Sequence, residues 1–180
     1  MITEEHIINR LNITNVAYDY KAAEFLEQLS KGAFLTTQYD GQSNVMTIGW
    51  GQIGIIWRKP VMTVLVRKSR YTKSLIDGSK EFTVSVPLNC DRQKELVCCG
   101  TVSGKDIDKF TSQNLTLLES EKIITPCLNF PGLHYECTVL YQTDIKLNEL
   151  DKIVHSAYYK DGDTHTIYFA EIVNTRYIER

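Results

Sequence analysis

The sequence predicts a mainly β fold in which the strands close into an antiparallel barrel. Several segments are rich in β-branched and aromatic residues, which favour strands. The segments with a helical pattern are short and lie between these strands. Strands and helices do not alternate regularly, as they do in a parallel doubly wound sheet. A closed barrel fits these observations best, because closure removes the exposed edges of a sheet.

The first part of the chain is expected to form an arm, a helix and three strands. Residues 1–20 show no convincing period and are interpreted as the N-terminal arm of a single domain covering residues 1–180. Apolar residues recur on one face of the segment 20–32, which predicts a helix that stops at Gly32. The segments that follow are a strand over 33–39, a hairpin turn over 40–43, a bent or bulged strand over 44–56, a chain break at Pro60 and a strand buried on both faces over 61–68.

The rest of the chain is expected to hold two short helices and three strands. These are a loop and helix over 69–78, an alternating strand over 80–87, a helix over 91–100 capped by Asn89 or Asp91, and long strands over 134–147 and 165–178. In the alternating strand, Phe82, Val84 and Val86 share one face, which is the pattern of a strand with one side on the core.

Charge and cysteine content restrict the possible functions. The formal charge of −2 gives no signature of polyanion binding and argues against a nucleic-acid partner. No apolar run approaches the ~18 residues of a membrane span, so we expect no membrane association. The five cysteines lack C-x-x-C spacing and the histidines are scattered, so we expect reduced thiols, a cytoplasmic location and no metal site. The adjacent Cys98 and Cys99 are interpreted as small buried residues, with a thiol near a redox site as the alternative.

The stretch from Asn44 to Gly54, NVMTIGWGQIG, contains the glycine pattern G-x-G-x-x-G. In a dinucleotide-binding fold this pattern leads into a helix whose N-terminus faces the pyrophosphate. Here IIWRKP follows, and its β-branched residues and proline leave no room for a crossover helix. The glycines either leave space for a flat ligand against exposed backbone, with Trp50 as an aromatic wall, or form a barrel corner that binds nothing.

A basic stretch rich in hydroxyl groups, RKSRYTKS, runs from Arg67 to Ser74. It lies where a buried strand ends and a helix begins, so free N–H groups and the helix dipole favour an anion there. Guanidinium, ammonium and hydroxyl donors together suit a phosphate monoester. The alternative interpretation is a solvated turn with ordinary surface lysines.

Five features of the sequence are short segments that follow one another in a characteristic order along the chain. They are NVMTIGW (44–50), RKSRYT (67–72), EFTVSVP (81–87), CGTVSGKDIDKF (99–110) and GDTHTIYFAEI (162–172). Together they resemble the flavin reductase-like, FMN-binding split-barrel family, most closely its flavoredoxin branch. The resemblance runs over about residues 31–178. It implies a Greek-key split β-barrel that binds FMN noncovalently, as a homodimer with the flavin near the subunit interface.

The resemblance also implies which residues hold FMN. The main chain of one segment would pair with the polar edge of the isoalloxazine ring, with side-chain bonds added by Asn44 and Thr47; this segment is Met46, Thr47, Ile48, Gly49 and Trp50. A second group would hold the 5′-phosphate and consists of Arg67, Lys68, Ser69, Tyr71 and Thr72. Ser103 and Lys105 would close over the site.

His165 is the candidate catalytic residue. Many flavin reductases that use NAD(P)H carry a contiguous Gly-Asp-His before the last strand, but here Thr164 separates Asp163 from His165. The family's usual Gly-Glu in that strand is replaced by Ala170-Glu171. The resemblance therefore leaves direct use of NAD(P)H open. His165 faces the flavin or a nicotinamide ring in one interpretation, and in the other it is a strand-end histidine satisfied by a neighbour.

The leading hypothesis for function is a flavin-dependent oxidoreductase that passes electrons or hydride through bound FMN. The electrons would come from NAD(P)H or from a redox protein partner. Because a flavin carries the redox chemistry itself, such a protein needs a binding site rather than a catalytic triad. The alternatives are a non-enzymatic FMN carrier and a split barrel without flavin that serves as an interaction module.

Overall fold

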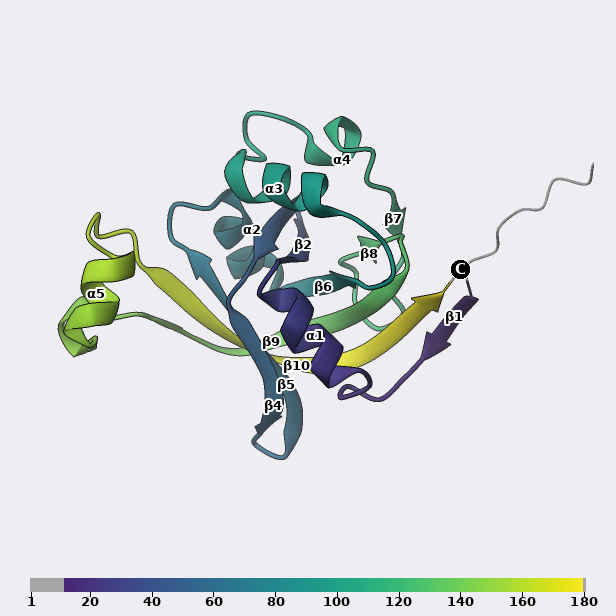
Figure 1. Cartoon of the computed structure of the whole chain (residues 1–180), viewed down its shortest axis with the longest axis horizontal. Coiled ribbons are helices and arrows are strands. Elements are labelled where there is room, and N and C mark those ends of the chain that lie inside the picture. Colours follow the sequence, from purple (N-terminus) through teal and green to yellow (C-terminus); the bar gives the residue numbers. More distant parts are fainter. Residues whose placement is uncertain (1–11, 180) are drawn as a thin grey trace, which may run out of the picture.

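A computed structural model describes residues 12–179, in which short helices surround a strongly curved sheet (Figure 1). In chain order the elements are β1 (Asn12–Asn15), α1 (Ala22–Leu29), β2 (Ala33–Tyr39), β3 (Gln42–Ile48), β4 (Gly51–Ile56), β5 (Lys59–Arg67), α2 (Tyr71–Ser79), β6 (Glu81–Pro87), α3 (Gln93–Thr101), α4 (Lys109–Ser112), β7 (Leu117–Leu118), β8 (Cys127–Leu128), β9 (Gly132–Asp144), the 3₁₀ turn η1 (Leu147–Glu149), α5 (Lys152–Tyr158) and β10 (His165–Glu179). Within residues 12–179, no helix is long and apolar enough to cross a membrane.

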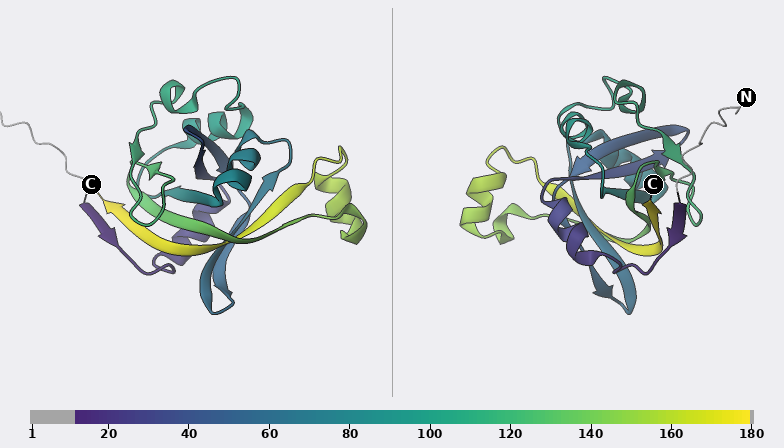
Figure 2. Two further views of the ribbon diagram at one scale, coloured as in Figure 1. Left: turned by 180° about the vertical axis from the view of Figure 1, so that it is seen from behind. Right: turned by 45° about the vertical axis from the view of Figure 1, so that its right-hand side comes forward.

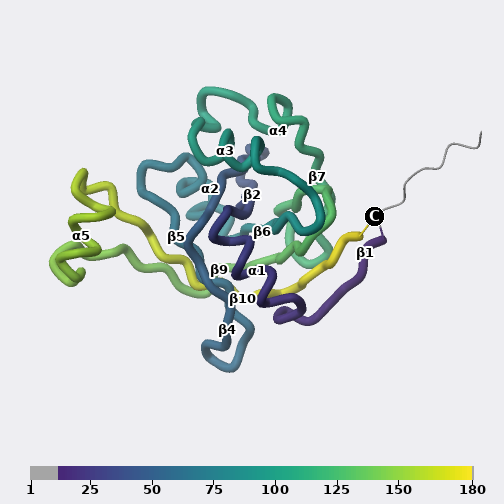
Figure 3. Tube along the Cα trace, in the orientation of Figure 1, coloured from purple at the N-terminus to yellow at the C-terminus, as the bar shows by residue number. Residues whose placement is uncertain are grey.

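Eight of the described strands form one antiparallel sheet in the order β3-β2-β6-β9-β10-β5-β4, with β1 beside β10. The strands at the two ends of this order, β3 and β4, follow each other in the chain and are separated only by Gly49 and Trp50. This two-residue link joins the two edges of the sheet, so the sheet curls into a barrel, as the chain trace in Figure 3 shows. The prediction of a mainly β antiparallel barrel is confirmed.

The two longest strands, β9 and β10, extend beyond the barrel and carry α5 at their far end. Figure 2 shows α5 standing away from the barrel in two further views. The connection between these strands, residues 145–164, is called the arm below. Register shifts in the β9–β10 pair lie at Phe169/Ala170 and Ile172/Asn174, where β10 bends around the barrel. The base of the arm therefore comes to lie beside the end of β5, which pairs with β10.

Two apolar clusters fill the described part of the molecule. The larger one lies inside the barrel, where Phe25 of α1 packs edge-on against Tyr135 of β9, with ring centroids 5.6 Å apart. The smaller one lies between α3 and the β2–β3 hairpin, where Leu96 and Cys99 pack against Phe34 and other buried side chains. This second cluster fixes α3 beside β3, and so it sets one wall of the site described below.

The turns explain where the sequence prediction and the structure differ. The segment 44–56 is not one bent strand but two strands, because the chain crosses from one sheet edge to the other at Gly49 and Trp50. Pro60 does not break the chain; it lies inside β5 opposite Ile55 of the edge strand β4, where a missing N–H can be tolerated. The reversal occurs earlier, at Trp57 and Arg58, with φ values of 53° and 59°. The expected turn at residues 40–43 is confirmed, since φ is positive at both positions between β2 and β3.

Helix ends follow the predictions with small shifts. The helix α1 ends at Leu29, and Gly32 has a φ of 119° just beyond it. The predicted cap, Asn89 or Asp91, is wrong, because α3 begins at Gln93 and its N-cap is Arg92; Asp91 lies one residue before the cap and accepts a hydrogen bond from the Gln93 N–H at 3.0 Å. Of the predicted N-terminal arm, residues 1–11 lie outside the described residues, and the described part includes β1, which pairs with the end of β10.

Candidate functional site

Two adjoining pockets form one groove along the outer side of β3. The first pocket has a volume of about 170 Å³ and is lined by Met46, Thr47, Ile48, Gly49, Trp50, Leu65, Arg67, Arg70 and His165. The second pocket has a volume of about 130 Å³ and is lined by Asn44, Met46, Ser69, Arg70, Tyr71, Thr72, Thr101, Val102, Ser103, Gly104 and Lys109. Met46 and Arg70 line both, so the pockets share a boundary. The groove brings together most residues that the sequence singled out.

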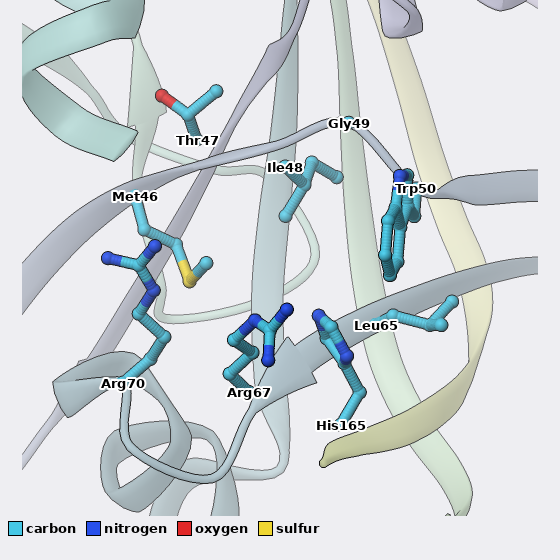
Figure 4. A pocket seen from close by; sticks show the side chains of 9 residues that line it. All are labelled: Met46, Thr47, Ile48, Gly49, Trp50, Leu65, Arg67, Arg70 and His165. Carbon is cyan, nitrogen blue, oxygen red and sulfur yellow. The ribbon is translucent and has the colours of Figure 1, made fainter. Parts of the chain in front are cut away.

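One wall of the first pocket is the backbone from Met46 to Trp50. In Figure 4 this segment faces the side chains of Arg67, Arg70 and His165 across the pocket. It belongs to β3, an edge strand of the sheet, so alternate backbone N–H and C=O groups on its outer side have no strand partner. The link residues, Gly49 and Trp50, lie outside both flanking strands. The wall therefore presents backbone donors and acceptors to the pocket.

The glycines of this stretch have different roles. Gly49 lines the first pocket. At Gly51 a Cβ would lie 2.6 Å from the Thr63 carbonyl oxygen, so this glycine serves the close approach of β4 to β5. At Gly54 there is open space and no pocket contact. Of these three glycines, Gly49 borders the groove and Gly51 belongs to the barrel corner.

The basic stretch divides between the groove and the arm. The Arg67 guanidinium donates hydrogen bonds to the backbone carbonyls of Asp163 at 2.6 Å and Tyr158 at 3.1 Å, so it borders the first pocket while holding the arm. Ser69 donates its N–H and its hydroxyl to the two carboxylate oxygens of Asp163, at 3.2 and 2.7 Å. Lys68 does not reach the groove, because its ammonium group pairs with Asp144 at 2.8 Å. Sequence spacing could not show these partners, which lie on the arm and at the end of β9.

Asn44 and Thr72 meet in the second pocket. The Asn44 Nδ2 group donates to the Thr72 hydroxyl at 2.7 Å, and both side chains are buried. A Cβ at Gly104 would lie 2.0 Å from Asn44 Oδ1, so only glycine fits against this amide. The expected side-chain role of Thr47 is not seen, since its hydroxyl donates to the Leu96 carbonyl of α3 at 2.6 Å and points away from the first pocket (Figure 4).

Lys109 is a site residue that the sequence analysis missed. It is 3% exposed, and its ammonium group donates to the Cys99 carbonyl at 3.3 Å while lining the second pocket. Among the described residues it forms no ion pair. Burial, with the nearby Arg70 guanidinium, lowers the pKa of Lys109, although the thiol of Cys99 opposes the shift. A buried cation without a carboxylate partner is costly, so this position is suited to an anion.

The segment 99–110 contributes Ser103, Gly104 and Lys109 to the lining of the second pocket. Ser103 lines the pocket, but Lys105 lies outside it, with its ammonium group 5.6 Å from the centre of the Tyr71 ring. The signal for Lys109 was present in the same motif, CGTVSGKDIDKF. Only the fold shows which lysine turns inward. Arg70, which borders both pockets, was recognised as part of the basic cluster but not as a site residue.

His165 begins β10 and is 7% exposed. Its Nδ1 is 2.9 Å from the hydroxyl oxygen of Tyr159, and its ring lies 5.0 Å from that of Trp50. Burial, assisted by the Arg67 and Arg70 guanidinium groups and opposed by Asp163, lowers the pKa of His165 to about 4. The imidazole is therefore neutral at pH 7. His165 thus lines the first pocket, and one of its ring nitrogens also has a hydrogen-bond partner within the chain.

The vicinal cysteines line neither pocket. Cys99 is fully buried in the cluster under α3, and burial raises the pKa of its thiol to about 11. A thiol that stays protonated is a poor nucleophile and a poor reductant. The structure therefore favours a packing role for Cys99.

Comparison with known proteins agrees with this geometry. The family model described as "Flavin reductase like domain" matches residues 30–180. An uncharacterized protein of Archaeoglobus fulgidus is 32% identical over 124 residues, which cover 66% of this chain and 69% of the relative. The protein YddH of Escherichia coli is 27% identical over 113 residues, which are 61% of this chain and 59% of YddH.

Solved structures share the fold. An FMN-binding domain of a flavin reductase-like enzyme from Shewanella baltica superposes with a TM-score of 0.64 at 19% identity, covering 92% of this chain and 77% of that one. Flavoredoxin from Methanosarcina acetivorans gives a TM-score of 0.63 at 24% identity, covering 80% and 66%. At these identities the likeness concerns the fold alone. The family model, which spans nearly the whole chain, shows that this protein belongs to the flavin reductase-like domain family.

Proposed function

We propose that this protein binds FMN noncovalently in the groove along β3 and acts as a flavin-dependent oxidoreductase. The observation that carries the proposal is the shape and chemistry of the groove. One end has a flat backbone wall with an aromatic side chain, and the other has two cations with hydroxyl groups. The first end suits an isoalloxazine ring and the second a 5′-phosphate.

The second pocket supplies the phosphate donors. Arg70 and Lys109 provide positive charge, and Thr72 and Ser103 provide hydroxyl groups. Lys109 has one hydrogen-bond acceptor in the described structure, the Cys99 carbonyl, so two of its three N–H donors have no protein partner there. A phosphate would accept these hydrogen bonds and compensate the buried charge. Tyr71 lines the same pocket, whereas the donors of Ser69 are held by Asp163 in this structure.

The first pocket would hold and orient the ring. The outward N–H groups of β3 can donate to the ring's polar edge, and such preorganised donors favour the negative charge that reduction places there. Trp50 and Leu65 line the ring position. When bound, FMN supplies the electron or hydride chemistry, and the protein provides position and electrostatics.

The electron donor is proposed to be NAD(P)H or a redox protein partner that reaches the first pocket from the side of His165 and Trp50. Trp50 is 39% exposed, so this side of the pocket is open. The oxidation of NADH or NADPH with added FMN distinguishes the oxidoreductase from a carrier. Turnover with either nucleotide supports direct use, and its absence with both leaves a protein donor or a carrier role.

We also propose a cytoplasmic homodimer. Large apolar side chains remain exposed near the β4–β5 turn, where Ile55 is 58% and Trp57 59% exposed, and on β9, where Tyr141 is 52% exposed. A second copy would cover such side chains.

The phosphate subsite can be tested by comparing FMN with riboflavin, which lacks only the phosphate. Fluorescence titration of flavin-free protein is expected to give a dissociation constant about 10- to 100-fold lower for FMN, as charge-assisted hydrogen bonds to the phosphate imply. Equal affinity for the two flavins would show that the second pocket does not hold the phosphate.

A further inference from the structure

The surroundings of His165 indicate which of its ring nitrogens carries the proton. The Tyr159 hydroxyl is buried and has His165 Nδ1 as its hydrogen-bond partner among the described residues, at 2.9 Å. A phenol can donate or accept. If Nδ1 carried the proton, the hydroxyl hydrogen of Tyr159 would be left in a buried place without an acceptor, which costs free energy. The hydroxyl group therefore donates to Nδ1, and Nε2 carries the ring proton.

The other ring nitrogen is directed at the ligand space. His165 lines the first pocket, and its Nε2 makes no hydrogen bond to any residue of the described chain. Among the described residues, the Nε2 atom of His165 does not count as a buried atom without a partner, so it is exposed at the surface that the pocket lines. An accessible N–H group of a neutral imidazole donates a hydrogen bond but does not deliver a proton at neutral pH.

The surroundings restrict what can accept this hydrogen bond. The His165 ring lies against Trp50, and Met46, Ile48 and Leu65 line the same pocket, which suits a flat and largely apolar molecule. The Arg67 guanidinium, which lines the same pocket, already donates to two backbone carbonyls of the arm, and Arg70 lies at the boundary with the second pocket. A flat molecule that presents a carbonyl oxygen can accept the hydrogen bond of His165 in this arrangement.

We propose that Tyr159 is a positioning residue that fixes the ring proton of His165 on Nε2, so that His165 donates a hydrogen bond to a carbonyl oxygen of a flat ligand in the first pocket. The ligand part rests on the proposed function. The carbonyl belongs either to the isoalloxazine ring itself or to a second, conjugated carbonyl compound bound over it. The positioning part rests only on contacts within this chain.

The positioning claim is tested by nitrogen NMR of ¹⁵N-labelled, flavin-free protein at pH 7. Wild-type His165 is expected to show a single tautomer with the proton on Nε2. Tyr159→Phe is expected to convert it to a mixture of tautomers, whereas Tyr158→Phe, which alters a neighbouring ring without a hydrogen bond to His165, leaves it unchanged. A wild-type proton on Nδ1, or an unchanged tautomer in Tyr159→Phe, overturns the proposal.

The ligand claim is tested with two probes. One is FMN added to flavin-free protein, and the other is 4-hydroxybenzaldehyde added to FMN-loaded protein. His165→Phe is expected to weaken one of the two by about 3- to 10-fold, the range for a neutral hydrogen bond. Tyr159→Phe is expected to weaken the same one only by the factor by which the Nε2-protonated population falls, about twofold for an equal mixture. A loss with FMN places the carbonyl on the flavin, and a loss with the aldehyde alone places it on a second ligand. No loss with either overturns the ligand claim. A protein that binds no FMN contradicts the proposed function, while the NMR result still decides the role of Tyr159.

Discussion

The Asn44 side chain donates a hydrogen bond to the Thr72 hydroxyl at 2.7 Å and so joins β3 to the first turn of α2. The two residues come from the two segments that the sequence analysis paired as a flavin site. Their contact places the edge of the sheet and the start of the helix on either side of the second pocket. The spacing between the walls of this pocket therefore depends on a buried amide.

Gly104→Ala is expected to open this contact. The new Cβ would lie 2.0 Å from Asn44 Oδ1, so the amide must move and its bond to Thr72 must break. We expect a loss of about 1–3 kcal/mol in the free energy of unfolding, the usual cost of overpacking, and about tenfold weaker FMN binding. Urea unfolding and flavin titration measure the two effects. Gly54→Ala is the matched control, because open space surrounds that position, and it should change neither quantity.

Lys109→Met is expected to separate binding from stability. Removing a buried charge that lacks an ion-pair partner should leave the free energy of unfolding unchanged or raise it. FMN affinity should fall by about 10- to 100-fold, because a charge-assisted hydrogen bond to the phosphate is lost. Riboflavin affinity should not change. In Lys94→Met, the same substitution at an exposed position of α3, both affinities should equal those of the wild type; an equal loss of FMN affinity there would contradict a specific role for Lys109.

The stability of the protein is expected to fall as the pH decreases from about 6.5 to 4. His134 is fully buried, with its ring nitrogens 3.0 Å from the Ser85 hydroxyl and 2.9 Å from the Phe130 carbonyl, and burial lowers its pKa from 6.5 to about 4. Between these values the unfolded chain binds a proton that the folded chain excludes. Stability is therefore full above pH 6.5 and is lost as the pH falls through this window, by about 3 kcal/mol.

Urea unfolding at pH 7.5 and pH 4.5 measures this loss. His134→Asn is expected to be less stable at pH 7.5 but to lose less stability on acidification. His155→Gln, on the partly exposed face of α5, should keep the full loss. The buried His165 adds a contribution of the same sign, so the loss does not vanish in the His134 variant. A His134 variant with an undiminished loss would show that other groups cause the acid sensitivity.

Light scattering tests the proposed homodimer. The wild-type protein is expected to have twice the mass of the 20.6 kDa chain. Replacing both Ile55 and Trp57 with serine removes exposed apolar surface near the β4–β5 turn and should shift the protein toward a folded monomer. Leu26→Ser is the control, since this residue is 54% exposed on α1. A wild-type monomer at all concentrations would contradict the proposal.

The sequence predicted the parts of the fold that depend on local pattern. Alternation and β-branched content located β2, β5, β6, β9 and β10, and the Asp40–Gly41 pair located a hairpin turn. The reversal at Trp57 and Arg58 was missed, because neither residue favours a positive φ and only the pairing of β4 with β5 imposes it. The connection over residues 145–164 was also missed, because its helix α5 is short and has no buried face that would give a helical pattern.

The site was predictable as two segments but not as a set of side chains. Asn44, Thr72 and Ser103 lie in the second pocket as expected. Lys68, which was predicted to lie in the site, lies outside the second pocket because it forms an ion pair with Asp144. Lys109, which was not predicted, lines this pocket because of the way the segment 99–110 packs. Such choices between similar residues are made by tertiary contacts, which a single sequence does not display.

The absorbance spectrum of the protein, purified with added FMN and then desalted, tests the central claim most directly. A protein that holds FMN in the groove should keep a yellow chromophore absorbing near about 450 nm, in a ratio of one flavin per chain. Lys109→Met treated in the same way should retain less flavin. A colourless wild-type protein after desalting, with no quenching of flavin fluorescence on remixing, would contradict the assignment of the groove as a flavin site.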